Sequence, residues 1–555
     1  MNFQKYERFK TINFKQRTWP DQQIEKAPTW VSVDLRDGNQ ALVTPMKIEE
    51  KVEMFQTLVS MGFKEIEVGF PSASQIEYDF IRLLIEEKLI PEDVTIQVLT
   101  QAREHLIRRT FEALEGLDKV ILHLYNSTSI LQRDVVFNKS KAEIKTIAIE
   151  GVKLVKALSL EFSGKVRLEY SPESFTGTEV EYALEVCEAV MDEWGATKED
   201  PVIINLPSTV EMSSPNVYAD QVEWMCTNFS DRKRVIVSLH AHNDRGCGVA
   251  ASELGIMAGA DRVEGTLFGN GERTGNVDII TLALNMFTQG VDPKLDISKI
   301  NDIKHVYEKV TKMTVHERHP YVGSLVFTAF SGSHQDAINK GMVAYNERQS
   351  KLWQVPYMPI DPSDVGRLYE PIVRINSQSG KGGVAFVMDS MYGFHLPKGL
   401  QVDFAKAIQD ISEVEGEVSP ERVYDTFVEE YIDQYTPIKF VKQKIIDISE
   451  EGEADRKAHI IVEVDGKERE LVGYGNGPIS AVKDAFNTSG LIQTHLLDYS
   501  EHALSSGSSS KAAAYVYLRL NESTIQEYGV GIHANITTAT ILAIVSGINR
   551  IYKKR

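Results

Sequence analysis

Cysteine is scarce in this chain of 555 residues, which contains only Cys187, Cys226 and Cys247. The three thiols form no Cys-x-x-Cys pair and no disulfide framework, a pattern that excludes a disulfide-rich secreted domain and fits a reducing cytosol. Long apolar runs are also missing: none approaches membrane-spanning length, and the first ten residues lack the apolar core of a signal peptide. We therefore expect a cytoplasmic protein without a membrane partner.

Basic residues are in deficit. Lysine and arginine total 60 against 79 aspartates and glutamates, so the formal net charge is −19. This charge disfavours nucleic acid and anionic membranes as partners, although a local basic pocket could still bind an anionic substrate. The length and the hydrophobic content of 42% predict a globular protein with two or more domains and a sizeable core.

A regular alternation begins after a polar and aromatic stretch, residues 1–28, which we expect to form an N-terminal arm. From there, short β-rich runs alternate with longer amphipathic segments. The runs are Trp30–Leu35, Glu65–Phe70, Val94–Leu99, Val120–Tyr125, Val166–Tyr170, Val202–Leu206, Val235–Leu239 and Arg262–Leu267. About eight such units in roughly 250 residues predict a closed (β/α)8 TIM barrel, at residues 29–310. A doubly wound open sheet is the alternative, but no glycine-rich dinucleotide turn follows the first run.

The seventh run, V-I-V-S-L-H-A-H-N-D (235–244), ends in two histidines, His240 and His242. Side chains alternate along a strand, so both imidazoles point the same way from the same edge. Two converging imidazoles suit a divalent metal. Taken alone, the pair could equally be two ordinary histidines at a strand end.

Polar residues whose side chains can take part in catalysis or binding recur in or just after the other runs. They are Arg36, Asp37, His123, Ser171, Glu173 and Thr209. Because the carboxyl ends of all barrel strands share the face on which such enzymes react, we expect one common site.

A glycine-rich segment, L-F-G-N-G-E-R-T-G-N-V-D (267–278), follows the eighth run. Its glycines allow close backbone approach to a ligand, and Asn276 can supply an amide oxygen to a metal. A turn before the last helix would explain the glycines. It would not explain the cluster Asn270, Glu272, Arg273 and Asn276.

Two further regions follow the barrel. We expect residues 311–425 to form linker subdomains over the active site, with His334, between small and polar residues, as a candidate acid–base group. Residues 426–555 contain an internal repeat in which each half reads as three strands and a helix. Few acid–base candidates cluster there, which favours ligand sensing or oligomerisation over catalysis.

Several motifs occur in an order that resembles one enzyme family. They are D-L-R-D-G-N-Q (34–40), E-V-G-F-P (67–71), Y-S-P-E (170–173), N-L-P-S-T-V-E (205–211), H-A-H-N-D (240–244), G-N-G-E-R-T-G-N (269–276) and S-G-S-H-Q-D (331–336). Single motifs are shared with homocitrate synthase, citramalate synthase and 3-hydroxy-3-methylglutaryl-CoA lyase. The full set, with the double βββα tail, closely resembles the alpha-isopropylmalate synthase family in its long form, which carries a C-terminal leucine-sensing domain.

The resemblance implies a TIM barrel, a linking subdomain and an α+β regulatory domain of two βββα units, assembled as a homodimer. It implies a transferase that condenses acetyl-CoA with 3-methyl-2-oxobutanoate and water to (2S)-2-isopropylmalate and CoA, the committed step of leucine biosynthesis. It also implies leucine as the effector. However, I-H-A-N (532–535) departs from the acidic residue that many relatives are expected to carry there, which leaves leucine inhibition open.

The resemblance also assigns roles to residues. The implied metal ligands are Asp37, His240, His242 and Asn276. The implied catalytic residues are Arg36, Glu67, Glu173, Glu272, His334 and Tyr369, and the oxoacid-binding residues are His123, Ser171 and Thr209. His334, helped by Glu272 or Tyr369, is expected to take a proton from the acetyl methyl group. The ligand set suits Mg2+, Mn2+ or Zn2+, of which the family favours Mg2+.

Two alternatives remain at this point. One is a related condensing enzyme that uses pyruvate or 2-oxoglutarate, as citramalate and homocitrate synthases do. 2-Oxoglutarate would require a cation for its second carboxylate, and none stands out near His123 or Ser171. The other is a non-catalytic metabolite sensor on an inactive barrel, which should have lost a ligand or the arginine.

Overall fold

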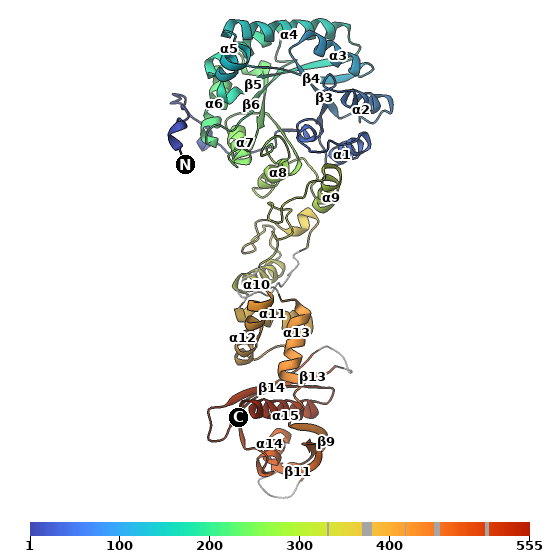
Figure 1. Ribbon diagram of the computed structural model, residues 1–555, viewed down its shortest axis with the longest axis vertical. Coiled ribbons are helices and arrows are strands. Elements are labelled where there is room, and N and C mark those ends of the chain that lie inside the picture. Colours follow the sequence, from blue (N-terminus) through green and yellow to red (C-terminus); the bar gives the residue numbers. More distant parts are fainter. Residues whose placement is uncertain (330–331, 369–379, 417, 449–455, 505–509) are drawn as a thin grey trace. The chain divides into compact units, whose positions relative to one another are not determined.

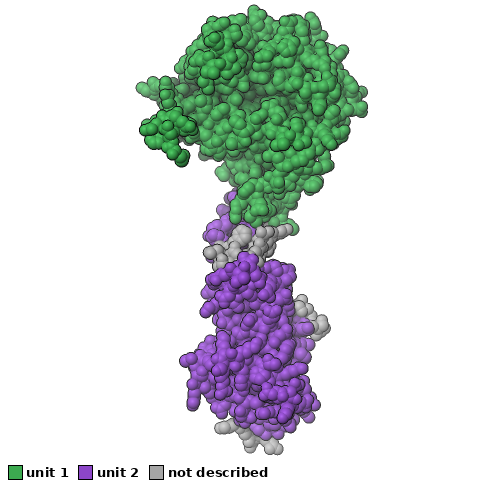
Figure 2. Space-filling view, viewed as in Figure 1, with its two compact units in different colours: residues 1–327, 360–368 green, residues 328–359, 369–555 purple. Residues whose placement is uncertain are grey.

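The computed structural model describes residues 1–329, 332–368, 380–416, 418–448, 456–504 and 510–555. The chain divides into two compact units, coloured separately in Figure 2. Unit 1 comprises Met1–Phe327 and Ile360–Leu368, and unit 2 comprises Thr328–Pro359 and Tyr369–Arg555. No helix among the described residues is long and apolar enough to cross a membrane.

Unit 1 contains a closed barrel of eight strands in sequential order, which confirms the predicted fold (Figure 1). Its strands are β1 Thr29–Ser32, β2 Glu65–Gly69, β3 Thr95–Gln101, β4 Lys119–Ser127, β5 Lys165–Glu173, β6 Val202–Ser208, β7 Val235–Ala241 and β8 Arg262–Gly265. The barrel closes through parallel pairing of β1 with β8. The apolar runs of the sequence reflect burial on both strand faces: every residue of β6 is buried.

A helix follows each strand, as the amphipathic segments predict. These are α1 Ile48–Ser60, α2 Gln75–Glu86, α3 Glu104–Leu114, α4 Lys141–Glu161, α5 Val180–Trp194, α6 Pro215–Asn228, α7 Gly248–Met257 and α8 Ile279–Phe287, with α9 Ile300–Thr311 beyond the barrel. In α1, for example, Met54, Phe55 and Leu58 form the buried stripe.

The first strand is shorter than its apolar pattern predicts. β1 ends at Ser32, and Asp34–Gly38 forms a turn of π-helix in which the Gly38 amide donates to the Val33 carbonyl, 3.1 Å away. The prediction of a strand to Leu35 was wrong because the chain turns at Asp34: the Val33 amide still donates to the Gly265 carbonyl at 2.8 Å, whereas Leu35 is buried within the π-helical turn. This turn carries Arg36 and Asp37.

Unit 2 begins with helices α10 Gly332–Arg348, α11 Gly380–Tyr392, α12 Lys398–Glu415 and α13 Pro420–Phe427. Side chains of α11, α12 and α13, among them Val387, Phe404 and Phe427, share a buried core with Tyr515 and Val530 of the C-terminal sheet. The predicted domain limit near residue 425 lies within α13, and the proposed limits stay predictions.

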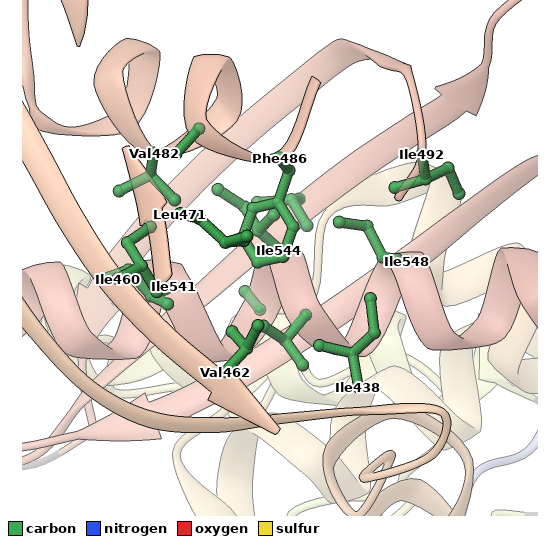
Figure 3. Close-up of a cluster of buried hydrophobic side chains, with 14 of the residues drawn as sticks. Ile438, Ile460, Val462, Leu471, Val482, Phe486, Ile492, Ile541, Ile544 and Ile548 are labelled. Atoms are coloured by element: carbon green, nitrogen blue, oxygen red, sulfur yellow. The ribbon is translucent and has the colours of Figure 1, made fainter. Parts of the chain in front are cut away.

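The C-terminal residues form the two predicted βββα units. The first contains β9 Ile438–Asp447, β10 Arg456–Val464, β11 Lys467–Gly475 and α14 Pro478–Thr488. The second contains β12 Thr494–Ala503, β13 Ala512–Leu520, β14 Gln526–His533 and α15 Ile536–Lys554. Each has its own antiparallel three-stranded sheet. Figure 3 shows the core that the two βββα units share. In it, Ile460 and Phe486 of the first βββα unit contact Ile541 and Ile544 of the second βββα unit.

Candidate active site

A cavity of about 450 Å³ lies at the carboxyl ends of the barrel strands. Its lining residues come from the later part of the strands or from the turns that follow them. Among them are the predicted site residues Arg36, Asp37, His123, Ser171, Glu173, Thr209, His240, His242 and Glu272. The barrel therefore brings together residues from both ends of its sequence, as the pattern of polar strand ends predicts.

Asp37, His240 and His242 form a buried polar cluster in this cavity, with ligand atoms that all lie within 4.8 Å of one another. The Asp37 Oδ2 atom is 3.1 Å from His240 Nε2 and 3.6 Å from His242 Nε2. The side-chain amide of Asn276 donates to the same Asp37 oxygen at 2.8 Å. The four residues that were predicted as metal ligands thus lie side by side.

The glycines near Asn276 are needed for the conformation of the loop that carries it. A Cβ atom on Gly275 would lie 1.8 Å from the Gly269 carbonyl oxygen, and one on Gly271 would lie 2.0 Å from Asn276 Oδ1. Both glycines also have positive φ angles, of 94° and 149°. Contacts within the loop therefore require these glycines, and their approach to a ligand stays a prediction.

The charges of the cluster are strongly coupled. Burial alone would raise the pKa of Asp37, but the Arg36 guanidinium and the two imidazoles hold it well below its usual range. Burial likewise opposes protonation of His240, yet its hydrogen bonds to Asp37 and Glu264 raise its pKa to about 9. Burial and the neighbouring His240 lower the pKa of His242 to about 4. Asp37 is therefore a carboxylate and His242 a neutral imidazole at pH 7.

This donor set fits a divalent cation. Asn276 Oδ1 is buried and has no hydrogen-bond partner among the described residues. Buried electron-pair donors without partners are costly, and a cation is one group that offsets that cost. Imidazole, carboxylate and amide oxygen together suit Mg2+, Mn2+ or Zn2+.

Arg36 places a fixed positive charge beside the cluster. Its Nε atom donates to Glu67 Oε2 at 2.9 Å, and its Nη1 atom is 3.3 Å from Asp37 Oδ1. Burial would lower the pKa of Arg36, but Glu67 and Asp37 raise it, so the guanidinium stays charged. Arg36 and Glu67, which were both predicted as catalytic residues, are therefore paired with each other.

The predicted oxoacid pocket lies on the adjoining strands. His123 Nε2 is 2.7 Å from Ser171 Oγ, and its Nδ1 is 3.2 Å from the Glu67 carboxylate. Glu173 accepts a hydrogen bond from the Ser127 hydroxyl. Thr209 Oγ1 accepts one from the Ser174 amide at 3.0 Å. Their roles toward a substrate stay predictions.

The three remaining predicted catalytic residues, Glu272, His334 and Tyr369, do not all lie at the cavity among the described residues. Glu272 lines the cavity, with its carboxylate 3.4 Å from Gln40 Nε2. His334 belongs to unit 2, where it is exposed on α10 and its ring centroid is 4.2 Å from that of Tyr357. Tyr369 lies outside the described residues. The roles of all three stay predictions.

A layer of buried polar residues that the sequence patterns did not predict lies at the floor of the cavity and beneath it, formed by Gln97, Glu169, Asn205, Arg262 and Glu264. A signal was available, because R-V-E-G (262–265) places two charged residues in a strand that is buried throughout. Arg273, for which no role was predicted, also lines the cavity and donates to Asp244 at 2.7 Å.

Known proteins resemble this chain over its whole length. It is 57% identical to the 2-isopropylmalate synthase of Clostridium acetobutylicum over 556 aligned residues, which cover 99% of each chain. The chain belongs to the 2-isopropylmalate synthase family. The synthase of Rhizobium meliloti is 55% identical, over 99% of this chain and 98% of its own, and that of Agrobacterium fabrum is 53% identical, over 99% of both.

Three domain families match successive segments of this member of the 2-isopropylmalate synthase family. Residues 27–306 match the HMGL-like family, and residues 324–389 match the alpha-isopropylmalate synthase post-catalytic domain-like family. Residues 417–552 match the LeuA allosteric (dimerisation) domain. The resemblance that the motifs indicated is thereby confirmed.

Proposed function

We propose that this protein condenses acetyl-CoA with 3-methyl-2-oxobutanoate and water, giving (2S)-2-isopropylmalate and CoA in the first committed step of leucine biosynthesis. The observation that carries the proposal is the cluster of Asp37, His240 and His242 beside Arg36, in a chain of this family. A divalent cation held there, for which we favour Mg2+ over Mn2+ or Zn2+, would supply Lewis-acid polarisation of the keto group.

The chain's own residues would do the rest. Arg36, held by Glu67, stabilises negative charge that develops on the keto oxygen. His123, Ser171 and Thr209 orient the oxoacid. His334, with help from Glu272 or Tyr369, accepts the proton of the acetyl methyl group and leaves the carbon nucleophile that attacks the ketone.

The cavity favours a branched oxoacid over 2-oxoglutarate. Phe70, Leu99 and Pro207 line it with apolar surface suited to an isopropyl group. Of its two lining arginines, Arg36 is assigned to the keto oxygen and Arg273 is paired with Asp244, so neither is left for a second substrate carboxylate. This argues against a homocitrate synthase.

Release of CoA from acetyl-CoA, followed with a thiol reagent, tests the substrate. We expect kcat/KM for 3-methyl-2-oxobutanoate to exceed that for pyruvate by at least about tenfold, because pyruvate leaves the apolar wall uncovered. Faster turnover of pyruvate would indicate a citramalate synthase. Absence of CoA release with every oxoacid would favour the metabolite sensor.

We further propose that leucine is the effector and binds between the two βββα units. A cavity of about 230 Å³ lies there, with Ile479 and Val482 of α14, Ile536 of α15 and Glu501 of β12 in its lining. Its apolar walls fit an isobutyl side chain, Glu501 fits an ammonium group, and the first turns of α14 and α15 attract a carboxylate.

Glu501→Gln should raise the leucine concentration for half-inhibition by about tenfold or more, with kcat and KM little changed, because it removes the partner of the ammonium group. The matched control is Glu470→Gln, an exposed carboxylate on β11 that contacts His459. Equal leucine sensitivity of the two variants and the unmodified protein would contradict this binding site. Truncation near residue 425 is a weaker test, because it would expose the core that α11–α13 share with β13 and β14.

We also propose a homodimer formed through the C-terminal domain, because the family that matches residues 417–552 is described as a dimerisation domain. A cytoplasmic location stays a prediction. It is supported by Cys187, Cys226 and Cys247, which are all free thiols.

A further inference from the structure

A charged layer fills the barrel directly beneath the cavity, where barrels usually hold branched apolar side chains. Glu264 and Glu169 are 0% exposed, and Arg262 is 1% exposed. Ionised groups at such depth are costly unless each is paired and hydrogen-bonded. Apolar residues would stabilise the barrel at lower cost, which indicates that the layer serves the site above it.

Glu264, at the end of β8, is the centre of the layer, and both of its oxygens are engaged. Its Oε1 atom accepts from Arg262 Nη1 at 2.7 Å and from Gln97 Nε2 at 3.0 Å. Its Oε2 atom is 2.7 Å from His240 Nδ1 and accepts from Asn205 Nδ2 at 3.2 Å. A carboxylate against Nδ1 fixes the orientation of the ring, so that its Nε2 atom faces the cluster around Asp37, 3.1 Å from Asp37 Oδ2.

The same carboxylate reaches the oxoacid pocket through two amides. Asn205 Nδ2, which bonds to Glu264, also donates to Ser171 Oγ at 3.0 Å. Gln97 Nε2, which bonds to Glu264, is 3.3 Å from His123 Nδ1. Glu264 therefore contacts the predicted metal ligand His240 directly. It is linked to His123 and Ser171 through one intervening amide side chain each.

We propose that Glu264 is a positioning residue that aligns the metal ligand His240 with the oxoacid-binding pair His123 and Ser171. Arg262 holds Glu264 in place, and Gln97 and Asn205 carry its orientation to the pocket. This inference rests on the proposed function, because it takes the cation and the oxoacid to bind at these residues.

A second cation is the competing interpretation of the layer, since ligand atoms of His123, Glu169 and Glu264 also lie within 4.8 Å of one another. The Arg262 guanidinium already supplies positive charge there: its Nη1 is 2.7 Å from Glu264 and its Nη2 is 3.2 Å from Glu169. Our proposal therefore requires one bound divalent ion per chain, and the competing interpretation requires two.

Mn2+ binding to the full-length protein, followed by electron paramagnetic resonance without substrates, tests the proposal independently of turnover. We expect one Mn2+ per chain, and we expect Glu264→Gln to raise its Kd roughly 10- to 100-fold. The matched control is Glu65→Gln, which removes another carboxylate from Arg262, 2.6 Å from its Nε, but no contact to His240. Its Mn2+ Kd should stay within about twofold of the original.

Gln97→Met gives a second readout that does not depend on the folding of the Glu264 variant. Gln97 contacts Glu264 and His123 but none of the predicted metal ligands. The KM for 3-methyl-2-oxobutanoate should rise roughly tenfold or more while the Mn2+ Kd stays unchanged. Loss of a residue with only a structural role would not change the KM for the oxoacid while leaving the Kd for Mn2+ unchanged.

Unaltered Mn2+ affinity in Glu264→Gln, an unaltered oxoacid KM in Gln97→Met, or two Mn2+ ions per chain would each overturn the proposal. Failure of the proposed function would look different. In that case the unmodified protein would bind Mn2+ and respond to Glu264→Gln as expected, yet release no CoA with 3-methyl-2-oxobutanoate.

Discussion

His240→Ala should reduce kcat/KM for CoA release by about 10³-fold or more, because Lewis-acid stabilisation of several kcal/mol depends on this ligand. His240 Nε2 lies 3.1 Å from Asp37 Oδ2 at the centre of the cluster, and its other nitrogen is held by Glu264. Removal of the ring leaves Asp37, His242 and Asn276, an incomplete set for a tightly bound ion. Steady-state kinetics at saturating Mg2+ and titration with Mn2+ would measure both losses.

The control is His105→Ala. His105 is an exposed histidine on α3, on the outside of the barrel. Its loss should leave both constants within about twofold of the original, as expected for a surface substitution. A His240→Ala variant that turned over normally with metal supplied would rule out the assignment of this cluster as the metal site.

Arg36→Lys should lower kcat by about 10²- to 10³-fold, the usual effect of removing one donor from a site that stabilises an oxyanion. Lysine keeps the charge but loses the planar fork that meets Glu67 through Nε and Asp37 through Nη1. Because Arg36 is not a predicted metal ligand, the Mn2+ Kd should change far less than kcat. This separation distinguishes loss of charge stabilisation from loss of the cation.

Arg234→Lys serves as the comparison for that experiment. Arg234 immediately precedes β7, at the opposite end of the strand from His240, and it pairs with Asp192. Its substitution should leave kcat unchanged within about twofold. Should Arg36→Lys retain full kcat, the proposed role of Arg36 at the keto oxygen would have to be abandoned.

Much of the fold could be predicted because it follows from local periodicity. The barrel strands are short apolar runs and most of the helices are amphipathic, so the eight units of the barrel and the two βββα repeats are visible in the sequence. The boundaries were less predictable. Val33 and Leu35 look like continuations of β1, yet they are buried by a π-helical turn that only the contacts of Asp34 with Ser32 and Leu267 explain.

The candidate site likewise contains residues that could be predicted from the sequence and residues that could not. The residues at the rim could be predicted because a parallel barrel gathers all carboxyl strand ends on one face. The layer beneath could not, because a charged residue in an apolar run has no predictable partner until the strands are placed. Arg262 and Glu264 illustrate this, since they pair with Glu65, Gln97 and Glu169 from three other strands.

The sequence by itself determined the alternating strands and helices, the repeat at the C-terminal end and the chemical types available at the cavity, since these depend on the order of neighbouring residues. Only the tertiary structure decided which groups meet. Asp37 and His240 are 203 residues apart in the chain and become neighbours through closure of the barrel. Burial and pairing in that closed barrel, rather than residue type, set the charge states of Asp37, His240 and His242.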